Sequence, residues 1–203
     1  MRLPTSHVQQ VRVSSDLQIC PICTRILYHQ DVLPRNIARA PGRMEPRKAG
    51  IARFSDPQLM IPRLNATTRD KAIREMAAQL QTAGFVDDAE KLIVPALQRE
   101  AMVSTALDHG LAFPHVRGVE GGGLTLGLGI SLKGIKFDSR DKSLTRIVFF
   151  IVIPTASSVF YLKLLAGLAE TFSDAEARKT LMAEEEPEKL WKALCKLTKK
   201  TVV

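Results

Sequence analysis

The sequence predicts an α/β fold in which helices flank a mixed β-sheet, and two observations lead to that prediction. Apolar strand-like runs and amphipathic helical patterns follow one another from about residue 57 to the C-terminus, as is typical of layered α/β domains. The run from Ile147 to Ile153 is apolar throughout, so both faces of that strand should be buried. The predicted order is one strand, two helices, three strands and three helices, in a three-layer domain over residues 54–203.

Local signals place the first strand and the first two helices. Residues 58–64 are typical of a short strand. N-cap residues precede a helix over about 68–83, whose apolar side chains recur at helical spacing. Asp88 can cap a second helix that extends to about residue 102. Pro95 should kink that helix or shift its start.

Three apolar stretches predict the remaining strands, over residues 111–113, 124–132 and 145–153. Pro114 ends the first of them, so His115 is predicted to lie in an exposed turn. Three helical patterns close the chain, over about 157–172, from residue 174, and over about 187–199. The inward face of the first of these helices is predicted to hold Leu162, Leu165, Ala169 and Phe172.

Residues 1–53 are predicted to be a poorly structured basic extension, because no apolar periodicity persists there and proline and glycine interrupt an Arg-rich stretch. The chain has a net charge of +8. Eight basic and three acidic residues lie in residues 1–50, so the remaining 153 residues carry only +3. This distribution weakens the case for nucleic-acid binding, and a basic tail that binds nucleic acid stays only as an alternative.

Cys20 and Cys23 form the one chemical motif of this extension. Their spacing allows half a zinc site or a redox pair, but His7 and His29 are not at a finger-like spacing from them. An inert pair is the competing interpretation, and we predict neither a metal site nor a cofactor. Met44 suggests a second hypothesis, that translation begins near that residue and the upstream stretch is a start-site error.

Several classes of protein are excluded or disfavoured. The longest unbroken apolar run has seven residues, whereas a membrane-spanning helix needs about 20. No secretory signal precedes the domain, and three cysteines cannot form a disulfide framework, so we expect a cytoplasmic protein. The chain contains no phosphate-binding P-loop, complete dinucleotide fingerprint, zinc-protease motif or nucleophile elbow.

The chemistry-bearing side chains of the ordered region gather in residues 99–117, with the sequence REAMVSTALDHGLAFPHVR. Both histidines of that region lie here, together with two arginines and two hydroxyl residues. For His115 the functional interpretation competes with that of an ordinary turn histidine. For Arg99 it competes with a surface ion pair to Glu100 or to another nearby acid.

This segment resembles the active-site region of the enzyme IIA domains of the bacterial phosphotransferase system, in the fructose, mannitol and nitrogen-regulatory class. Those domains typically read R-E-x-x-x-S-T-G, then G-[NH]-G, then [IV]-A-[IV]-P-H. The matching residues here are Arg99-Glu100, Ser104-Thr105-Ala106, Asp108-His109-Gly110 and Leu111-Ala112-Phe113-Pro114-His115. The resemblance extends from about Phe54 to the C-terminus.

The resemblance implies that His115 accepts a phosphoryl group from a histidine-containing phosphocarrier protein and passes it to an enzyme IIB domain or keeps it as a regulatory mark. It assigns phosphate binding to Arg99, and Ser104 and Thr105 can donate hydroxyl hydrogen bonds to the same group. His109 and Tyr161 are candidate supporting residues. Neutral imidazole is a good nucleophile near pH 7, and a guanidinium fork suits the phosphoryl oxygens without a metal.

Four positions depart from the family pattern. Many members carry a second histidine where this chain has Tyr161, a phenol that stays neutral. Ala106 replaces a glycine, Asp108 adds a negative charge to the second motif, and Val116 replaces a small residue. These departures bear on transfer rate and partner choice, and they leave the nucleophile in place.

The sequence therefore predicts a phosphoryl carrier of the phosphoenolpyruvate-dependent phosphotransferase system, modified on His115, with a nitrogen-regulatory or carbohydrate-uptake role. We favour regulation because no permease or IIB segment is fused to the chain. The alternative is a regulatory binding module with the same fold that has lost phosphotransfer, so enzymatic activity stays open. The main hypothesis requires that the ring of His115 be accessible and that a guanidinium lie close enough to share an anion with it.

Overall fold

The computed structural model divides the chain into two compact units, residues 1–47 and 48–203. It describes residues 50–119, 123–139, 141–154 and 160–202, and the backbone of two short strands in the first unit. Those strands, β1 (Leu17–Ile19) and β2 (Ile26–Tyr28), pair antiparallel. The Cys20–Cys23 pair and the proposed start at Met44 lie outside the described residues.

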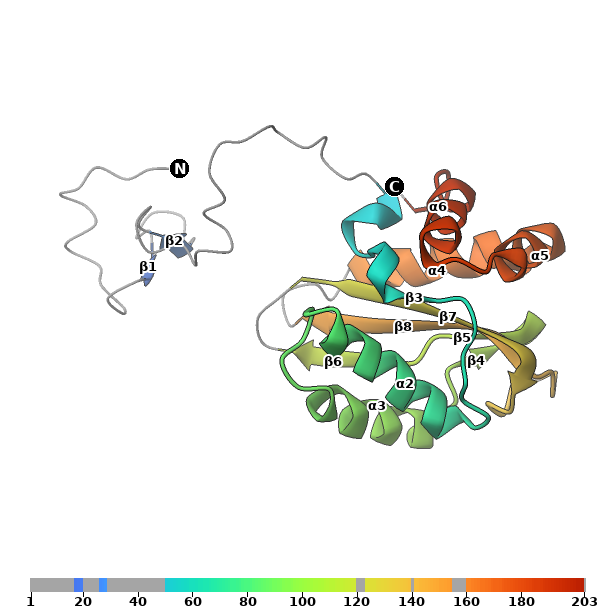
Figure 1. Ribbon diagram of the computed structural model, residues 1–203. Helices are drawn as coiled ribbons and strands as arrows, with labels where there is room; N and C mark the ends of the chain where they lie inside the picture. The colour runs from blue at the N-terminus through green and yellow to red at the C-terminus, as the bar shows by residue number, and fades with distance from the viewer. Residues whose placement is uncertain are drawn as a thin grey trace. The chain divides into compact units, whose positions relative to one another are not determined.

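The second unit is built on a six-stranded mixed sheet with β8 near its centre (Figure 1). The strand order is β3-β7-β8-β5-β4, and β6 also pairs with β8. The pairs β3–β7, β5–β8 and β6–β8 are parallel, whereas β7–β8 and β4–β5 are antiparallel. The strands are β3 (Met60–Ile61), β4 (Ala106–Leu107), β5 (Leu111–Ala112), β6 (His115–Val119), β7 (Thr125–Ile135) and β8 (Thr145–Pro154).

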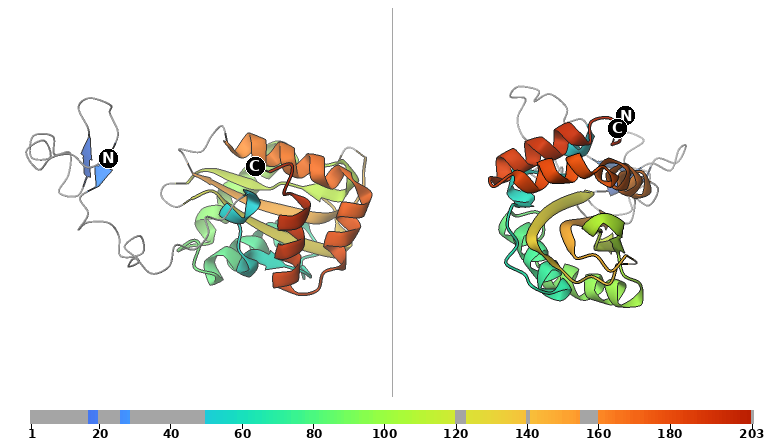
Figure 2. Two further views of the ribbon diagram at one scale, coloured as in Figure 1. Left: turned by 90° about the horizontal axis from the view of Figure 1, so that it is seen from above. Right: turned by 90° about the vertical axis from the view of Figure 1, so that its right-hand side faces the viewer.

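Helices cover both faces of this sheet, as Figures 1 and 2 show. On one face lie α2 (Arg69–Thr82) and α3 (Glu90–Met102), and on the other lie α4 (Phe160–Ser173), α5 (Ala175–Ala183) and α6 (Pro187–Leu197). Short 3-10 turns, η2 (Gly50–Arg53), η3 (Pro57–Leu59) and η4 (Asp108–Gly110), complete the unit. The predicted α/β class with a mixed sheet between helices is confirmed.

Local capping signals account for the helix starts. The hydroxyl of Thr68 accepts the N–H of Lys71 at the start of α2, and a carboxylate oxygen of Asp174 accepts the N–H of Ala177 in α5. Pro187 occupies the first turn of α6, where its missing N–H costs nothing. Because α3 begins at Glu90 and continues through Pro95, the proline does not set the start of the helix, and the alternative that it kinks the helix stays a prediction.

The segment around Pro114 differs most from the prediction. Leu111 pairs with Ile147 and His115 pairs with Ile151, so β5 and β6 follow β8 in one continuous register. Pro114 interrupts the ladder only because proline has no N–H; its carbonyl oxygen still accepts the N–H of Ile151 at 3.0 Å. His115 is therefore the first residue of a strand. The prediction that it lies in an exposed turn is wrong.

Two further predictions need correction. Residues 57–59 form η3, so the first strand is only Met60–Ile61. On α4, Leu162 is 56% exposed, and the buried face carries Tyr161, Leu164, Leu168 and Phe172. The predicted helix was therefore rotated by about one position, an error that periodicity alone allows when two neighbouring phases both contain leucine.

The corner at Gly110 offers a test of how η4 packs on β8. Gly84 and Gly110 both have φ near +74°, but only at Gly110 would an added Cβ meet backbone, 2.9 Å from the carbonyl oxygen of Leu144. Gly84→Ala should cost about 1–2 kcal/mol for the left-handed conformation. Gly110→Ala should cost about 1–3 kcal/mol more because the backbone must shift. Urea unfolding followed by Trp191 fluorescence measures both, and equal costs would contradict this packing.

Candidate functional site

The ring of His115 sits at the start of β6 with one nitrogen already bonded. Its Nδ1 lies 3.0 Å from the carbonyl oxygen of Phe113. Because a carbonyl can only accept, Nδ1 carries a proton in this contact, and in the neutral ring the lone pair is then on Nε2. Only 9% of the residue is exposed. The ring of His115 was expected to be accessible, and the structure leaves only a small part of this residue open to solvent.

Burial also sets the charge of this ring. Desolvation lowers the pKa of His115 below its ordinary value of 6.5, and the positive charges of Arg99 and Arg117 lower it further. The hydrogen bond to Phe113 and the charge of Glu100 act in the opposite direction. Since the net shift is downward, the imidazole is neutral at pH 7 and keeps a nucleophilic nitrogen.

Tyr161 and Arg117 complete the surroundings of His115. The ring centroid of Tyr161, at the start of α4, lies 6.4 Å from that of His115. The guanidinium carbon of Arg117 stands 4.9 Å from the centroid of the Tyr161 ring, a cation–π contact. His115 and Arg117 are two residues apart on β6, so both point to the same face of the sheet. The structure thus brings Tyr161, a predicted supporting residue, beside the histidine.

Arg99 lies in the last turn of α3 and acts on His115 through its charge. Its Nη1 donates to the carbonyl oxygen of Val103 at 2.9 Å, which orients the guanidinium at the helix end. Its charge acts on the pKa of His115. The competing ion pair with Glu100 is not what this structure shows, because the carboxylate of Glu100 accepts hydrogen bonds from the following loop instead.

Glu100 is the buried organiser of that loop, with 2% of its surface exposed. Its carboxylate accepts the N–H of Thr105 at 2.9 Å, the hydroxyl of Thr105 at 2.6 Å and the hydroxyl of Ser104 at 3.2 Å. The Ser104 hydroxyl also contacts the carbonyl oxygen of Phe137. The single proton of the Ser104 hydroxyl can serve only one of these two acceptors at a time, so the two bonds from Thr105 are the ones that hold the loop on α3. Phosphate binding by Ser104 and Thr105 stays a prediction, and it requires those hydroxyls to change partners.

His109 lies away from the His115 site. It belongs to η4, which precedes β5, whereas His115 follows β5. Along β8, His115 pairs with Ile151, whereas Leu111, which follows η4, pairs with Ile147. Four residues of a strand span about 13 Å, so η4 and His115 lie at least that far apart along the sheet. The structure therefore does not bring His109, the other predicted supporting residue, to the nucleophile.

Sequence reasoning counted Arg117 among the chemistry-bearing residues of 99–117 but gave it no role. A strand interpretation of residues 115–119 would have placed it on the face of His115 by its i, i+2 spacing. Glu100 was named only within the Arg99-Glu100 motif and as an ion-pair partner for Arg99, so its role in holding the loop was missed. In the parts of the second unit that the structure describes, no group of three or more His, Cys, Asp or Glu side chains could hold a metal ion.

Most of the second unit matches a known family of proteins. Residues 53–196 match the family model "Phosphoenolpyruvate-dependent sugar phosphotransferase system, EIIA 2". The chain belongs to this family, and it is a phosphoryl carrier of the enzyme IIA type with a sugar-transport or nitrogen-regulatory role.

Three relatives illustrate what the chain is similar to. The chain is 28% identical over 140 residues to the nitrogen regulatory protein of Bradyrhizobium diazoefficiens, covering 68% of this chain and 90% of the relative. The crystal structure of nitrogen regulatory protein IIA-Ntr from Neisseria meningitidis has a TM-score of 0.64 at 20% identity, covering 70% of this chain and 96% of that one. A complex of mannitol IIA with phosphorylated IIB from Escherichia coli has a TM-score of 0.55 at 17% identity. The match covers 70% of this chain and 94% of that one.

None of the described helices is long and apolar enough to cross a membrane.

Glu100 should matter for stability far more than an exposed acid on the same helix. Glu100→Gln removes the charge that accepts three hydrogen bonds, and we expect a loss of about 1.5–3 kcal/mol in the free energy of unfolding. Glu90→Gln, on the exposed face of α3, should cost under about 0.5 kcal/mol. Urea denaturation of both variants measures the difference. Similar values for the two would mean that Glu100 does not organise the loop.

Proposed function

We propose that Nε2 of His115 is the phosphoryl acceptor of this carrier. The observation that supports the proposal is the contact of Nδ1 with the carbonyl oxygen of Phe113 at 3.0 Å, in a ring whose pKa is lowered by burial. This contact holds the proton on Nδ1 and leaves Nε2 as the nucleophile. The ring needs no general base, because it loses no proton in the attack.

The transfer step is an in-line exchange of one nitrogen–phosphorus bond for another. The lone pair of Nε2 attacks the phosphorus of a phosphohistidine on a histidine-containing phosphocarrier protein. A new N–P bond forms at His115, the donor's N–P bond breaks, and its electron pair returns to the donor imidazole. The product is a phosphoramidate, which is labile enough for onward transfer.

Positive charge from two arginines supports this step. Arg99 and Arg117 both lower the pKa of His115, so both place positive potential at the ring. The same potential stabilises the negative phosphoryl oxygens that arrive on Nε2, and planar guanidinium groups can bind such oxygens with two parallel hydrogen bonds. The side chain of Arg117 is exposed and its guanidinium lies over the Tyr161 ring beside His115. From this position the guanidinium can approach the phosphoryl group from the solvent side.

The relatives also support a proposal for the onward partner and the biological role. Enzyme IIA domains pair with IIB domains, as in the mannitol complex. For this chain we expect either a IIB domain or a regulatory target as acceptor, and we favour regulation because of the likeness to the nitrogen regulatory protein. A phosphoenolpyruvate-linked donor would place the protein in the cytoplasm.

Phosphorylation should depend on His115 and not on His109. Incubation of the full chain with phosphoenolpyruvate and the general phosphotransferase proteins should yield one acid-labile phosphate, detected by mass spectrometry. His115→Ala should abolish the label. His109→Asn should retain it, because asparagine tolerates the left-handed backbone at that position. Labelling of the His115 variant would overturn the proposal, and an unlabelled wild-type chain would favour the non-catalytic binding module.

The pKa of His115 should rise when Arg117 loses its charge. Arg117→Gln removes one of the positive charges that oppose ring protonation, so the pKa should shift upward toward 6.5. The acid limb of the phosphorylation rate, where the protonated ring cannot attack, should move to higher pH with it. NMR titration of the imidazole Hε1 resonance measures the pKa directly. Arg74→Gln, an exposed arginine on α2 paired with Glu90, serves as the control and should leave the pKa in place.

A further inference from the structure

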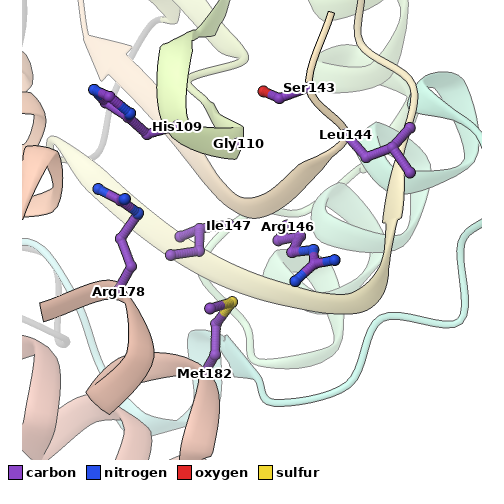
Figure 3. A pocket seen from close by; sticks show the side chains of 8 residues that line it. All are labelled: His109, Gly110, Ser143, Leu144, Arg146, Ile147, Arg178 and Met182. Atoms are coloured by element: carbon purple, nitrogen blue, oxygen red, sulfur yellow. The ribbon is translucent and has the colours of Figure 1, made fainter. Parts of the chain in front are cut away.

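A hollow of about 360 Å³ lies beside the first residues of β8, away from His115, and Figure 3 shows the side chains that line it. It is formed by η4, by the turn and first residues of β8, and by α5. Its lining residues are His109, Gly110, Ser143, Leu144, Arg146, Ile147, Arg178 and Met182. The volume is in the range of small-metabolite sites.

The polar side chains of this hollow are basic or neutral. His109 and Arg178 lie on one side of it, and Arg146 lies on the other side beyond Ile147 (Figure 3). None of the eight lining residues is acidic. Asp141 lies close to the hollow, but its carboxylate is already engaged with the backbone N–H groups of His109 and Ser143. The hollow therefore attracts an anion.

Arg178 is held in place by the preceding helix. Its Nη1 donates to the carbonyl oxygens of Phe172 and Ser173, each at 2.7 Å, at the C-terminal end of α4. A guanidinium has five N–H donors, so these two bonds leave Nη2 and Nε able to bind a ligand. The helix end thus orients the fork before any ligand arrives.

His109 is held in place by backbone geometry. Its φ of +69° is left-handed, which is uncommon outside glycine. One carboxylate clamps this corner: Oδ2 of Asp141 accepts the N–H of His109 at 3.2 Å, and Oδ1 accepts the N–H of Ser143 at 2.9 Å. Hydrogen bonds from Ser143 hold the pKa of Asp141 well below its usual range, so the clamp stays ionised. Such fixed geometry reduces the entropy cost of binding.

We infer that this hollow binds a small organic phosphate monoester. The phosphate group would lie between the ring of His109 and the guanidinium of Arg178, whose donors suit phosphoryl oxygens. The carbon part would lie against Ile147 and Met182, and Arg146 would add positive potential from the opposite rim. The site shares no residue with the His115 site, and the inference does not depend on phosphotransfer at that histidine.

NMR titration of the full ¹⁵N-labelled chain with glycerol 3-phosphate in 150 mM salt tests this inference. Binding should be saturable, with amide shifts centred on His109, Ser143 and Arg178. Glycerol should cause no such shifts, and inorganic phosphate should bind more weakly because it lacks the carbon part. Shifts centred on His115 and Arg117, or no saturation by about 10 mM ligand, would overturn the site.

Two variants and a matched control identify the donors. Arg178→Gln should weaken binding about tenfold or more, as loss of a charged hydrogen-bond donor does, and Arg146→Gln should weaken it less. Lys179→Gln removes the same charge from the next position of α5, where the side chain is exposed and outside the hollow. It should leave the affinity within about twofold. Arg178 also donates hydrogen bonds to the end of α4. If the Arg178→Gln variant does not fold for that reason, the affinity of the Arg146→Gln variant for glycerol 3-phosphate is the test of the site. Equal affinities for Arg146→Gln and Lys179→Gln would contradict the inference.

Discussion

The parallel pairing of β6 with β8 is the constraint on which the His115 site depends. That pairing fixes His115 opposite Ile151 and turns Arg117 to the same face. It also continues the register of β5 past a proline that cannot donate, so the carbonyl oxygen of Phe113 comes within reach of Nδ1. The site therefore rests on strand geometry, and the side chains are more precisely placed than they would be in a free turn.

Burial and charge act together on that ring. Desolvation keeps the imidazole neutral, which provides the nucleophile, and the same burial leaves little of it open to a donor protein. Glu100 moderates the positive potential of the two arginines while it holds the Ser104–Thr105 loop against α3. The acid is thus both a structural anchor and part of the electrostatics that set the pKa.

Much of the fold could be predicted from local sequence signals, because helix caps such as Thr68 and Asp174 and the apolar run of β8 act within a few residues of themselves. The errors arose where distant pairing decides the outcome. The register of β6 depends on β8, more than 30 residues away, so His115 was assigned to a turn and Arg117 was not placed beside it.

The sequence identified candidate residues of the site, but it did not show which of them lie together. A motif gathers His109 and His115 within seven residues of sequence, yet a strand separates them in space. Conversely, Tyr161 lies far away in sequence and stands beside the histidine. Its phenol has a consequence that a second imidazole would not have. A neighbouring imidazolium would oppose protonation of His115 by its own positive charge. Here the positive charges that lower the pKa of His115 are instead those of Arg99 and Arg117, and the burial of the ring lowers it most.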